Sequence, residues 1–105
     1  MYTIIEAPAF KDKADRLWTT RERLEFLAWL AHNPLAGDVI PKGGGLRKVR
    51  WQHSNKGKRG GVRIIYFYFN RLANGTIFAI DIYSKNEKTD LTAQELHQLK
   101  GAKHD

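Results

Sequence analysis

Lysine and arginine side chains are concentrated in the middle of this sequence, where they could bind or cleave a polyanion. The stretch from residue 42 to residue 71 holds half of the chain's 18 Lys and Arg residues, and no Asp or Glu occurs between Asp38 and Asp81. A fold does not need so much positive charge where no carboxylate can neutralise it. A nucleic acid attracts it, because each phosphate contacted by Lys or Arg releases condensed counterions and adds affinity. The pattern predicts a surface that faces nucleic acid.

Three of these cations have a spacing that suits chemistry on RNA. Lys48 and Arg50 share one face of a predicted strand, and Arg63 lies early on the next strand. RNA carries its own nucleophile, the 2′-hydroxyl, so a protein need only remove that proton, stabilise charge on the phosphate and protonate the leaving 5′ oxygen. Crowded cations disfavour the protonated form of a lysine, which makes Lys48 a candidate base. Arg63 suits charge stabilisation because it stays protonated and can bind two oxygens at once.

The same cations also fit a protein that binds RNA or DNA without cleaving it, and composition alone favours this interpretation. Other reaction types have little support in the sequence. The four histidines are not paired at a spacing that would hold a metal, and no carboxylate cluster accompanies them. The glycines at positions 57, 60 and 61 precede a predicted strand rather than a helix, so they do not form a phosphate-binding loop. We therefore expect either a nucleic-acid-binding protein or an RNA-cleaving enzyme that uses no metal or other cofactor.

The composition of the whole chain fits a small soluble domain with an anionic partner. At 105 residues the chain is long enough for one domain, residues 1–105, with its own hydrophobic core. The formal net charge of +7 favours a polyanionic partner. There is no cysteine, which excludes disulfides and is compatible with a reducing cytoplasm. We see no signal peptide and no membrane-spanning run, and we expect a cytoplasmic location.

The first third of the chain predicts a short strand followed by two helices. Tyr2–Glu6 has strand character, and Pro8 suits the first turn of a helix. Thr19 and Glu22 can form a capping box that begins a second helix, which Asn33-Pro34 ends. The residues expected to be buried by the second helix are Leu24, Leu27, Ala28, Leu30 and Ala31. The aromatic residues expected in the core or at its edge are Trp18, Phe26 and Trp29.

The rest of the chain predicts three successive antiparallel strands and a short final helix. The expected strands are Leu46–Gln52, Val62–Phe69 and Thr76–Tyr83, and residues 34–45 are expected to form a loop. The final helix, Asp90–Lys100, has a second candidate capping box. The predicted fold class is α+β: an antiparallel sheet with an N-terminal helical hairpin and a short C-terminal helix, all helices lying on one face of the sheet.

Three blocks of the sequence resemble the RelE/HigB toxins of type II toxin–antitoxin modules, and most closely the HigB-like branch. The blocks are GGLRKVRW at Gly44–Trp51, KGKRGGVRIIYFYF at Lys56–Phe69 and IYSKNEKTDLT at Ile82–Thr92. The resemblance implies a RelE-like (microbial RNase-like) fold and a metal-independent endoribonuclease, an mRNA interferase that cuts messenger RNA in the ribosomal A site and so inhibits translation. It also implies a cognate antitoxin, HigA-like in this branch and often carrying a helix-turn-helix domain.

The resemblance also assigns roles to the cations on the predicted strands. Lys48 and Arg50 match the family's paired basic positions on the second strand, and Arg63 matches its phosphate-stabilising arginine. Lys85 falls in the segment after the last strand, where relatives carry a basic cluster that includes the proposed general acid. The candidate catalytic residues are therefore Lys48, Arg50, Arg63 and Lys85.

The identity of the general acid stays open, because the sequence departs from the family pattern at two positions. Asn86 stands where an arginine is expected, and Thr92 stands where a tyrosine is expected. Lys85 or Tyr83 could donate the proton, or a ribosomal group or water could replace the missing donor. The residues expected to contact RNA or the ribosome are Arg47, Lys56, Lys58, Arg59, Tyr66, Tyr68, Tyr83 and Asn86.

Overall fold

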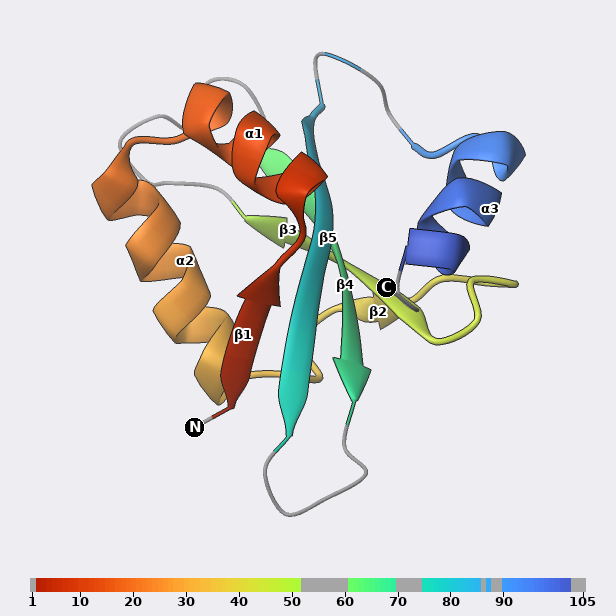
Figure 1. Cartoon of the computed structure of the whole chain (residues 1–105), viewed down its shortest axis with the longest axis horizontal. Helices are drawn as coiled ribbons and strands as arrows, with labels where there is room; N and C mark the ends of the chain where they lie inside the picture. Colours follow the sequence, from red (N-terminus) through yellow and green to blue (C-terminus); the bar gives the residue numbers. More distant parts are fainter. Residues whose placement is uncertain (1, 52–60, 70–74, 86, 88–89, 103–105) are drawn as a thin grey trace.

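A computed structural model of the chain has a small α+β architecture, with three helices and a five-stranded mixed sheet in the part that it describes (Figure 1). That part comprises residues 2–51, 61–69, 75–85, 87 and 90–102. In chain order the elements are β1 (Thr3–Glu6), α1 (Pro8–Leu17), α2 (Thr20–His32), β2 (Asp38–Val39), β3 (Leu46–Trp51), β4 (Val62–Phe69), β5 (Thr76–Ser84) and α3 (Ala93–Ala102).

The strands lie in the order β1-β5-β4-β3-β2. Strands β3, β4 and β5 are antiparallel neighbours, as predicted. The prediction of an antiparallel sheet is wrong at its edge, because β1 pairs in parallel with β5. The predicted loop also contains the short strand β2, which pairs with β3. Two residues are too few to produce a periodic signal in the sequence, which explains why β2 escaped prediction.

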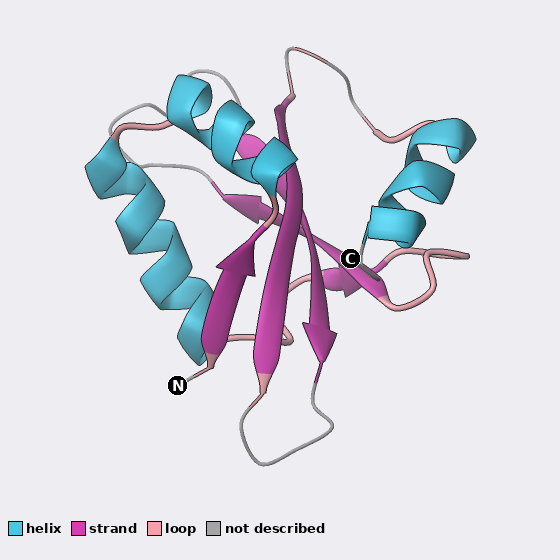
Figure 2. Cartoon of the chain, in the orientation of Figure 1, coloured by secondary structure: helices cyan, strands magenta, loops and turns pink. Residues whose placement is uncertain are grey.

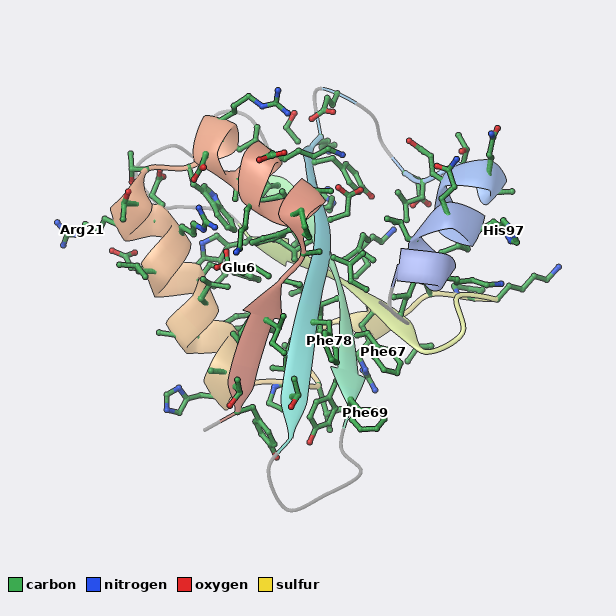
Figure 3. The ribbon with its side chains drawn as sticks, viewed as in Figure 1. Glu6, Arg21, Phe67, Phe69, Phe78 and His97 are labelled. Atoms are coloured by element: carbon green, nitrogen blue, oxygen red, sulfur yellow. The ribbon has the colours of Figure 1, made fainter. Side chains whose placement is uncertain are left out.

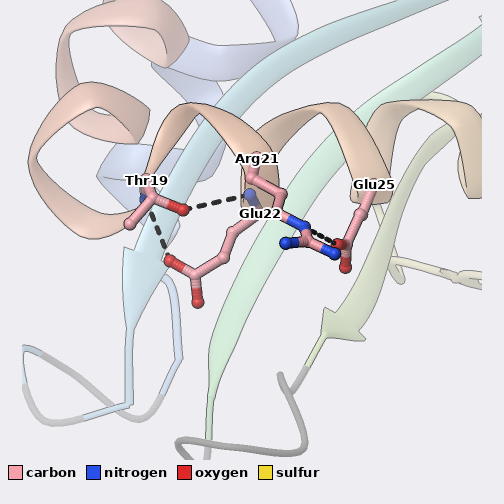
Figure 4. Close-up of polar contacts among 4 residues, drawn as sticks. All are labelled: Thr19, Arg21, Glu22 and Glu25. Carbon is pink, nitrogen blue, oxygen red and sulfur yellow. Dashed lines mark hydrogen bonds and ion pairs between the residues drawn. The ribbon is translucent and has the colours of Figure 1, made fainter.

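The predicted capping box forms at the start of α2 (Figure 4). The backbone N–H of Thr19 donates to Glu22 Oε1 at 2.9 Å, and the N–H of Glu22 donates to Thr19 Oγ1 at 3.1 Å. Arg21 and Glu25 form an ion pair one turn apart on the exposed side, with 3.2 Å between Nε and Oε1. The two reciprocal bonds between Thr19 and Glu22 satisfy backbone donors that the start of a helix otherwise leaves unpaired, and they fix where α2 begins.

The buried face of α2 differs in part from the predicted one. Leu30 and Ala31 are buried and Leu27 is half-buried, as expected, but Leu24 and Ala28 are exposed, so their prediction as inward-facing residues is wrong. Residues four positions apart share one face of a helix. Glu22 of the capping box therefore lies on the same face as the core residue Phe26. The residues in that buried row are Glu22, Phe26 and Leu30.

The first core lies between the sheet and the pair α1 and α2. As predicted, Trp18 and Phe26 are part of it, with their ring centroids 5.2 Å apart, and Trp29 packs against it. Alternate residues of the central strands point into this core, in keeping with strand geometry. Its buried members are Phe10, Ala14, Trp18, Phe26, Leu30, Val49, Val62, Ile64, Tyr66, Ile77, Ala79 and Ile82.

A second core lies on the opposite face of the sheet, beneath α3. It consists of Leu46, Ile65, Ile80 and Tyr83, and side chains from α3 and the residues just before it pack against it. The helices therefore cover both faces of the sheet, and the prediction that they share one face is wrong (Figures 1 and 2). The reason is that β4 is apolar on both faces, so each face needs a cover.

Phenylalanine side chains continue the second face beyond the end of α3. Figure 3 shows Phe67, Phe69 and Phe78 on the α3 side of the sheet. Phe67 pairs with Phe78 across β4 and β5, and its ring centroid lies 6.3 Å from that of Phe69. Phe69 is 40% exposed, so α3 covers only part of this face.

Candidate functional site

The three predicted catalytic cations of β3 and β4 lie on one face of the sheet. Arg50 and Arg63 are direct Cα partners, and Lys48 pairs with Ile65, which belongs to the second core. Because side chains alternate along a strand, Lys48, Arg50 and Arg63 all extend from the face that α3 partly covers. Arg50 is exposed, whereas Lys48 and Arg63 are half-buried. We call these three residues the basic cluster.

The pairing of Arg50 with Arg63 places two like charges directly opposite each other across antiparallel strands. Residues in such positions have Cβ atoms about 5 Å apart, and like charges there destabilise the sheet. Neither residue is displaced to the other face, because their neighbours Val49 and Ile64 are held in the first core. Two guanidinium groups on one face suit a group with several negative oxygens, such as a phosphodiester.

Lys48 has an acidic partner that the sequence did not reveal. Its Nζ lies 3.1 Å from Asp90 Oδ1, and the same carboxylate oxygen accepts the backbone N–H of Leu91 at 2.8 Å. The bond from Leu91, together with Lys48, holds the pKa of Asp90 below its ordinary value. A phosphate would therefore have to compete with Asp90 for the Lys48 ammonium. Asp90 precedes the predicted capping box of α3, but only the packing of α3 brings it to β3.

Tyr83 lies beside Arg63 in the register of β4 and β5, but its side chain is covered. It is fully buried in the second core, beneath α3. Burial, followed by the charge of Asp90, raises the pKa of Tyr83 to about 12, whereas Arg63 acts in the opposite direction. The prediction of Tyr83 as a surface contact for RNA is therefore wrong for this conformation, because the phenol does not reach solvent.

Tyr66 was predicted to contact RNA, and this prediction is wrong. The side chain is fully buried in the first core, on the face opposite the basic cluster. Its hydroxyl donates to Pro34 O at 2.8 Å and accepts the N–H of Gly37 at 2.8 Å. A Cβ on Gly37 would come within 2.8 Å of the Tyr66 ring, so the glycine permits this close approach. Tyr66 thus anchors the loop before β3, and burial raises its pKa.

Two further predicted RNA contacts also lie on the face opposite the basic cluster. Arg47 pairs with Tyr66 across β3 and β4, and its Nη1 donates to Gly37 O at 2.7 Å. Tyr68 is half-buried and packs edge-on against Tyr2, with ring centroids 5.2 Å apart. An RNA bound to the basic cluster would not meet these side chains on the same surface.

Lys85 lies next to the basic cluster along the sheet. It directly follows β5, two residues beyond Tyr83, and its backbone N–H donates to Gly61 O at 3.5 Å. Gly61 is two residues before Arg63 in the sequence. The exposed Lys85 therefore lies at the end of the sheet where β4 begins, close to Arg63. The other predicted contacts, Lys56, Lys58, Arg59 and Asn86, lie outside the described residues.

A second ion pair joins α1 to the sheet on the other side. Lys13 Nζ lies 2.8 Å from Asp81 Oδ1, and the Asp81 side chain is buried. Asp81 lies at an irregularity of the β4–β5 register, where Ile65 pairs with Asp81 and the next residue of β4 pairs with Ala79.

A pocket of about 270 Å³ lies between side chains of α1, including Lys13, and Glu87. The pocket is lined by Lys13, Arg16, Leu17 and Glu87, so Asp81 and Glu87 place two carboxylates near its two cations. The basic cluster has three cations, with the Asp90 carboxylate bound to Lys48, and is the better anion site.

No protein-family model matches the chain. Within residues 2–51, 61–69, 75–85, 87 and 90–102, no three His, Asp or Glu side chains are grouped so that they could hold a metal ion. Across the same residues, no helix has the length and apolar character needed to cross a bilayer. The candidate site consists of the basic cluster, with Lys85 beside it and Asp90 bound to Lys48.

Proposed function

We propose that this protein is a RelE/HigB-type toxin of a type II toxin–antitoxin module, with a RelE-like fold, that cuts messenger RNA on the ribosome. The observation that carries the proposal is the pairing of Arg50 with Arg63 on the face that also bears Lys48. Two arginines held directly opposite each other offer several N–H donors to one phosphodiester. The three blocks of sequence that resemble this family coincide with β3, with β4 and with the end of β5.

In this mechanism the 2′-hydroxyl of the RNA attacks the adjacent phosphate. Arg63 and Arg50 bind the phosphoryl oxygens and stabilise the negative charge that builds up on them in the transition state. Lys48 is the candidate base that accepts the proton of the 2′-hydroxyl once a bound substrate has displaced Asp90. The 2′ oxygen then forms a bond to phosphorus while the bond from phosphorus to the 5′ oxygen breaks. The exposed Lys85 is the candidate proton donor to the leaving 5′ oxygen, since Tyr83 is covered. The reaction needs no metal or cofactor.

The ribosome supplies what the basic cluster cannot. Arginine and lysine side chains bind phosphates of any sequence, so they do not fix the in-line geometry that attack by the 2′-hydroxyl requires. We propose that the ribosomal A site holds the message in that geometry. We also propose a cytoplasmic protein whose activity is suppressed by a HigA-like antitoxin, and a small helix-turn-helix protein encoded beside this chain is the expected sign of it.

The test is cleavage of messenger RNA on programmed ribosomes, read by primer extension. Wild type should cut the message, and Arg63→Ala should reduce the rate about 100-fold or more, because it removes a charge-stabilising donor. Arg21→Ala is a matched control, since Arg21 is 89% exposed on α2, on the far side of the molecule from α3 (Figure 3). An uncut message with wild type, or equal cleavage by wild type and Arg63→Ala, would refute the proposal.

The alternative function is a basic domain that binds RNA or DNA without cleaving it. The observation that favours it is the state of the site, in which Lys48 is paired with Asp90 and Tyr83 is buried. This alternative predicts strongly salt-dependent binding to free nucleic acid and no growth arrest on expression. Growth arrest that disappears in the double variant Lys48→Ala, Arg63→Ala would count against it.

A further inference from the structure

Contacts of α3 and of the segment just before it with the sheet include a row of leucines and one polar contact near each end. Leu91, Leu96 and Leu99 pack against the second core, and all three are only half-buried. At the C-terminal end Lys100 Nζ donates to Lys42 O at 3.1 Å. Three residues before the N-terminal end of α3, Asp90 forms its ion pair with Lys48 on β3. By contrast, α1 and α2 each bury at least two side chains fully in the first core.

The Asp90 carboxylate binds Lys48 in the way that an RNA phosphate would. It presents a negative oxygen to the Lys48 ammonium at 3.1 Å, on the face that bears the basic cluster. The Asp90 side chain is 67% exposed and that of Lys48 is 32% exposed, so water and other anions can reach the pair. Exposed ion pairs contribute little to stability, and an anion with more negative charge can displace the carboxylate.

We propose that Asp90 and α3 form an autoinhibitory lid, in which Asp90 occupies the place of RNA on Lys48 until RNA displaces it. The inference rests on the proposed function in taking RNA as the ligand. When RNA displaces Asp90, the segment before α3 loses its ion pair with β3, and the first turn of α3 opens more often while the leucines keep the rest of the helix on the second core. Asp90 is a positioning residue in this scheme, because it acts on RNA only through Lys48.

The first arm of the test measures RNA binding by Asp90→Asn. Asparagine keeps the oxygen that accepts the N–H of Leu91 but removes the charge that holds Lys48. The matched control is Asp12→Asn, which changes the net charge by the same amount at an exposed position of α1. Fluorescence anisotropy with a short single-stranded RNA should show about fivefold tighter binding for Asp90→Asn than for Asp12→Asn. Equal affinities for the two variants would overturn the proposal.

The second arm measures hydrogen exchange of the α3 amides and needs no RNA. Exchange should be faster in Asp90→Asn than in wild type and in Asp12→Asn, because the attachment to Lys48 is lost. Adding the RNA to wild type should also speed exchange in α3. Unchanged exchange in Asp90→Asn overturns the lid even where RNA binds well. If hydrogen exchange in α3 is faster in Asp90→Asn but no variant binds RNA, then Asp90 does not compete with RNA for Lys48, and the proposed function fails as well. In that case only the role of Asp90 in attaching α3 would stand.

Discussion

Arg50 and Arg63 are direct partners in the antiparallel pairing of β3 with β4, so two arginines lie opposite each other on one face of the sheet. The next pair along the strands, Val49 with Ile64, points the other way into the first core. A slip of one residue would move these apolar side chains to the opposite face, which fixes the register. Packing on one face therefore holds two like charges opposite each other on the other face.

The first prediction concerns the cost of this pairing. Arg50→Thr removes one of the two charges and introduces a residue that strands favour. We expect the free energy of unfolding to stay the same or to rise by about 0.5 kcal/mol, because the repulsion from Arg63 is relieved. RNA binding should weaken, and its slope against log salt concentration should fall by about one. Urea denaturation and a salt titration of binding measure the two effects. A large loss of stability would mean that Arg50 has a structural role.

The second prediction separates Tyr66 from the basic cluster. Tyr66→Phe removes a hydroxyl that bonds Pro34 O and the N–H of Gly37 inside the protein. Leaving those buried groups without their partner should lower the free energy of unfolding by about 1–2 kcal/mol. RNA binding should not change, because Tyr66 lies on the opposite face of the sheet. Urea denaturation and RNA binding by the same variant provide the comparison. A loss of RNA binding in a variant that is still folded would contradict the assignment.

The third prediction tests the start of α2. Thr19→Ala removes the side-chain acceptor for the N–H of Glu22 and should cost about 1 kcal/mol of stability. Thr20→Ala is the control, since Thr20 is exposed in the first turn and is not the capping residue. In thermal and urea denaturation, Thr19→Ala should be less stable than Thr20→Ala. Equal stabilities would show that the capping box contributes nothing measurable.

Local signals in the sequence were sufficient for most of the fold. Val62–Phe69 is a run of β-branched and aromatic residues, and β4 has these bounds. The capping box of Thr19 and Glu22 also forms as predicted. No such local signal in the sequence tells which face of the sheet α3 packs on. Because β4 is apolar on both faces, either face could have received the last helix, and long-range packing decides which one does.

The candidate site was predictable only in part, for two different reasons. Strand periodicity already separates Arg63 from Tyr66 and Tyr68, because residues an odd number of positions apart point to opposite faces. That signal was present in the sequence and would have excluded the two tyrosines from the basic face. The ion pair of Lys48 with Asp90 had no signal of this kind. The two residues are 42 positions apart, and their contact depends on where α3 packs.

The last prediction uses the pKa of Tyr83, which burial beneath α3 raises from 10.0 to about 12. A tyrosine whose folded pKa is raised stabilises the fold through its neutral form. That stability is fully present below the unfolded pKa of about 10 and is lost as the pH rises through the folded pKa. We therefore expect the free energy of unfolding to fall between about pH 10 and pH 12.

Tyr83→Phe should remove part of that pH dependence. Phenylalanine keeps the ring but cannot ionise, so urea denaturation at a series of pH values should show a shallower fall for this variant than for wild type. Tyr66→Phe is a useful comparison, because burial raises the pKa of Tyr66 on the other face of the sheet. When Tyr83 ionises and the fold loses stability, hydrogen exchange in α3 should become faster. Ionisation of Tyr66 should instead loosen the loop at Gly37. If wild type and Tyr83→Phe lose stability in parallel over this pH range, the Tyr83 hydroxyl is not covered by α3 in solution.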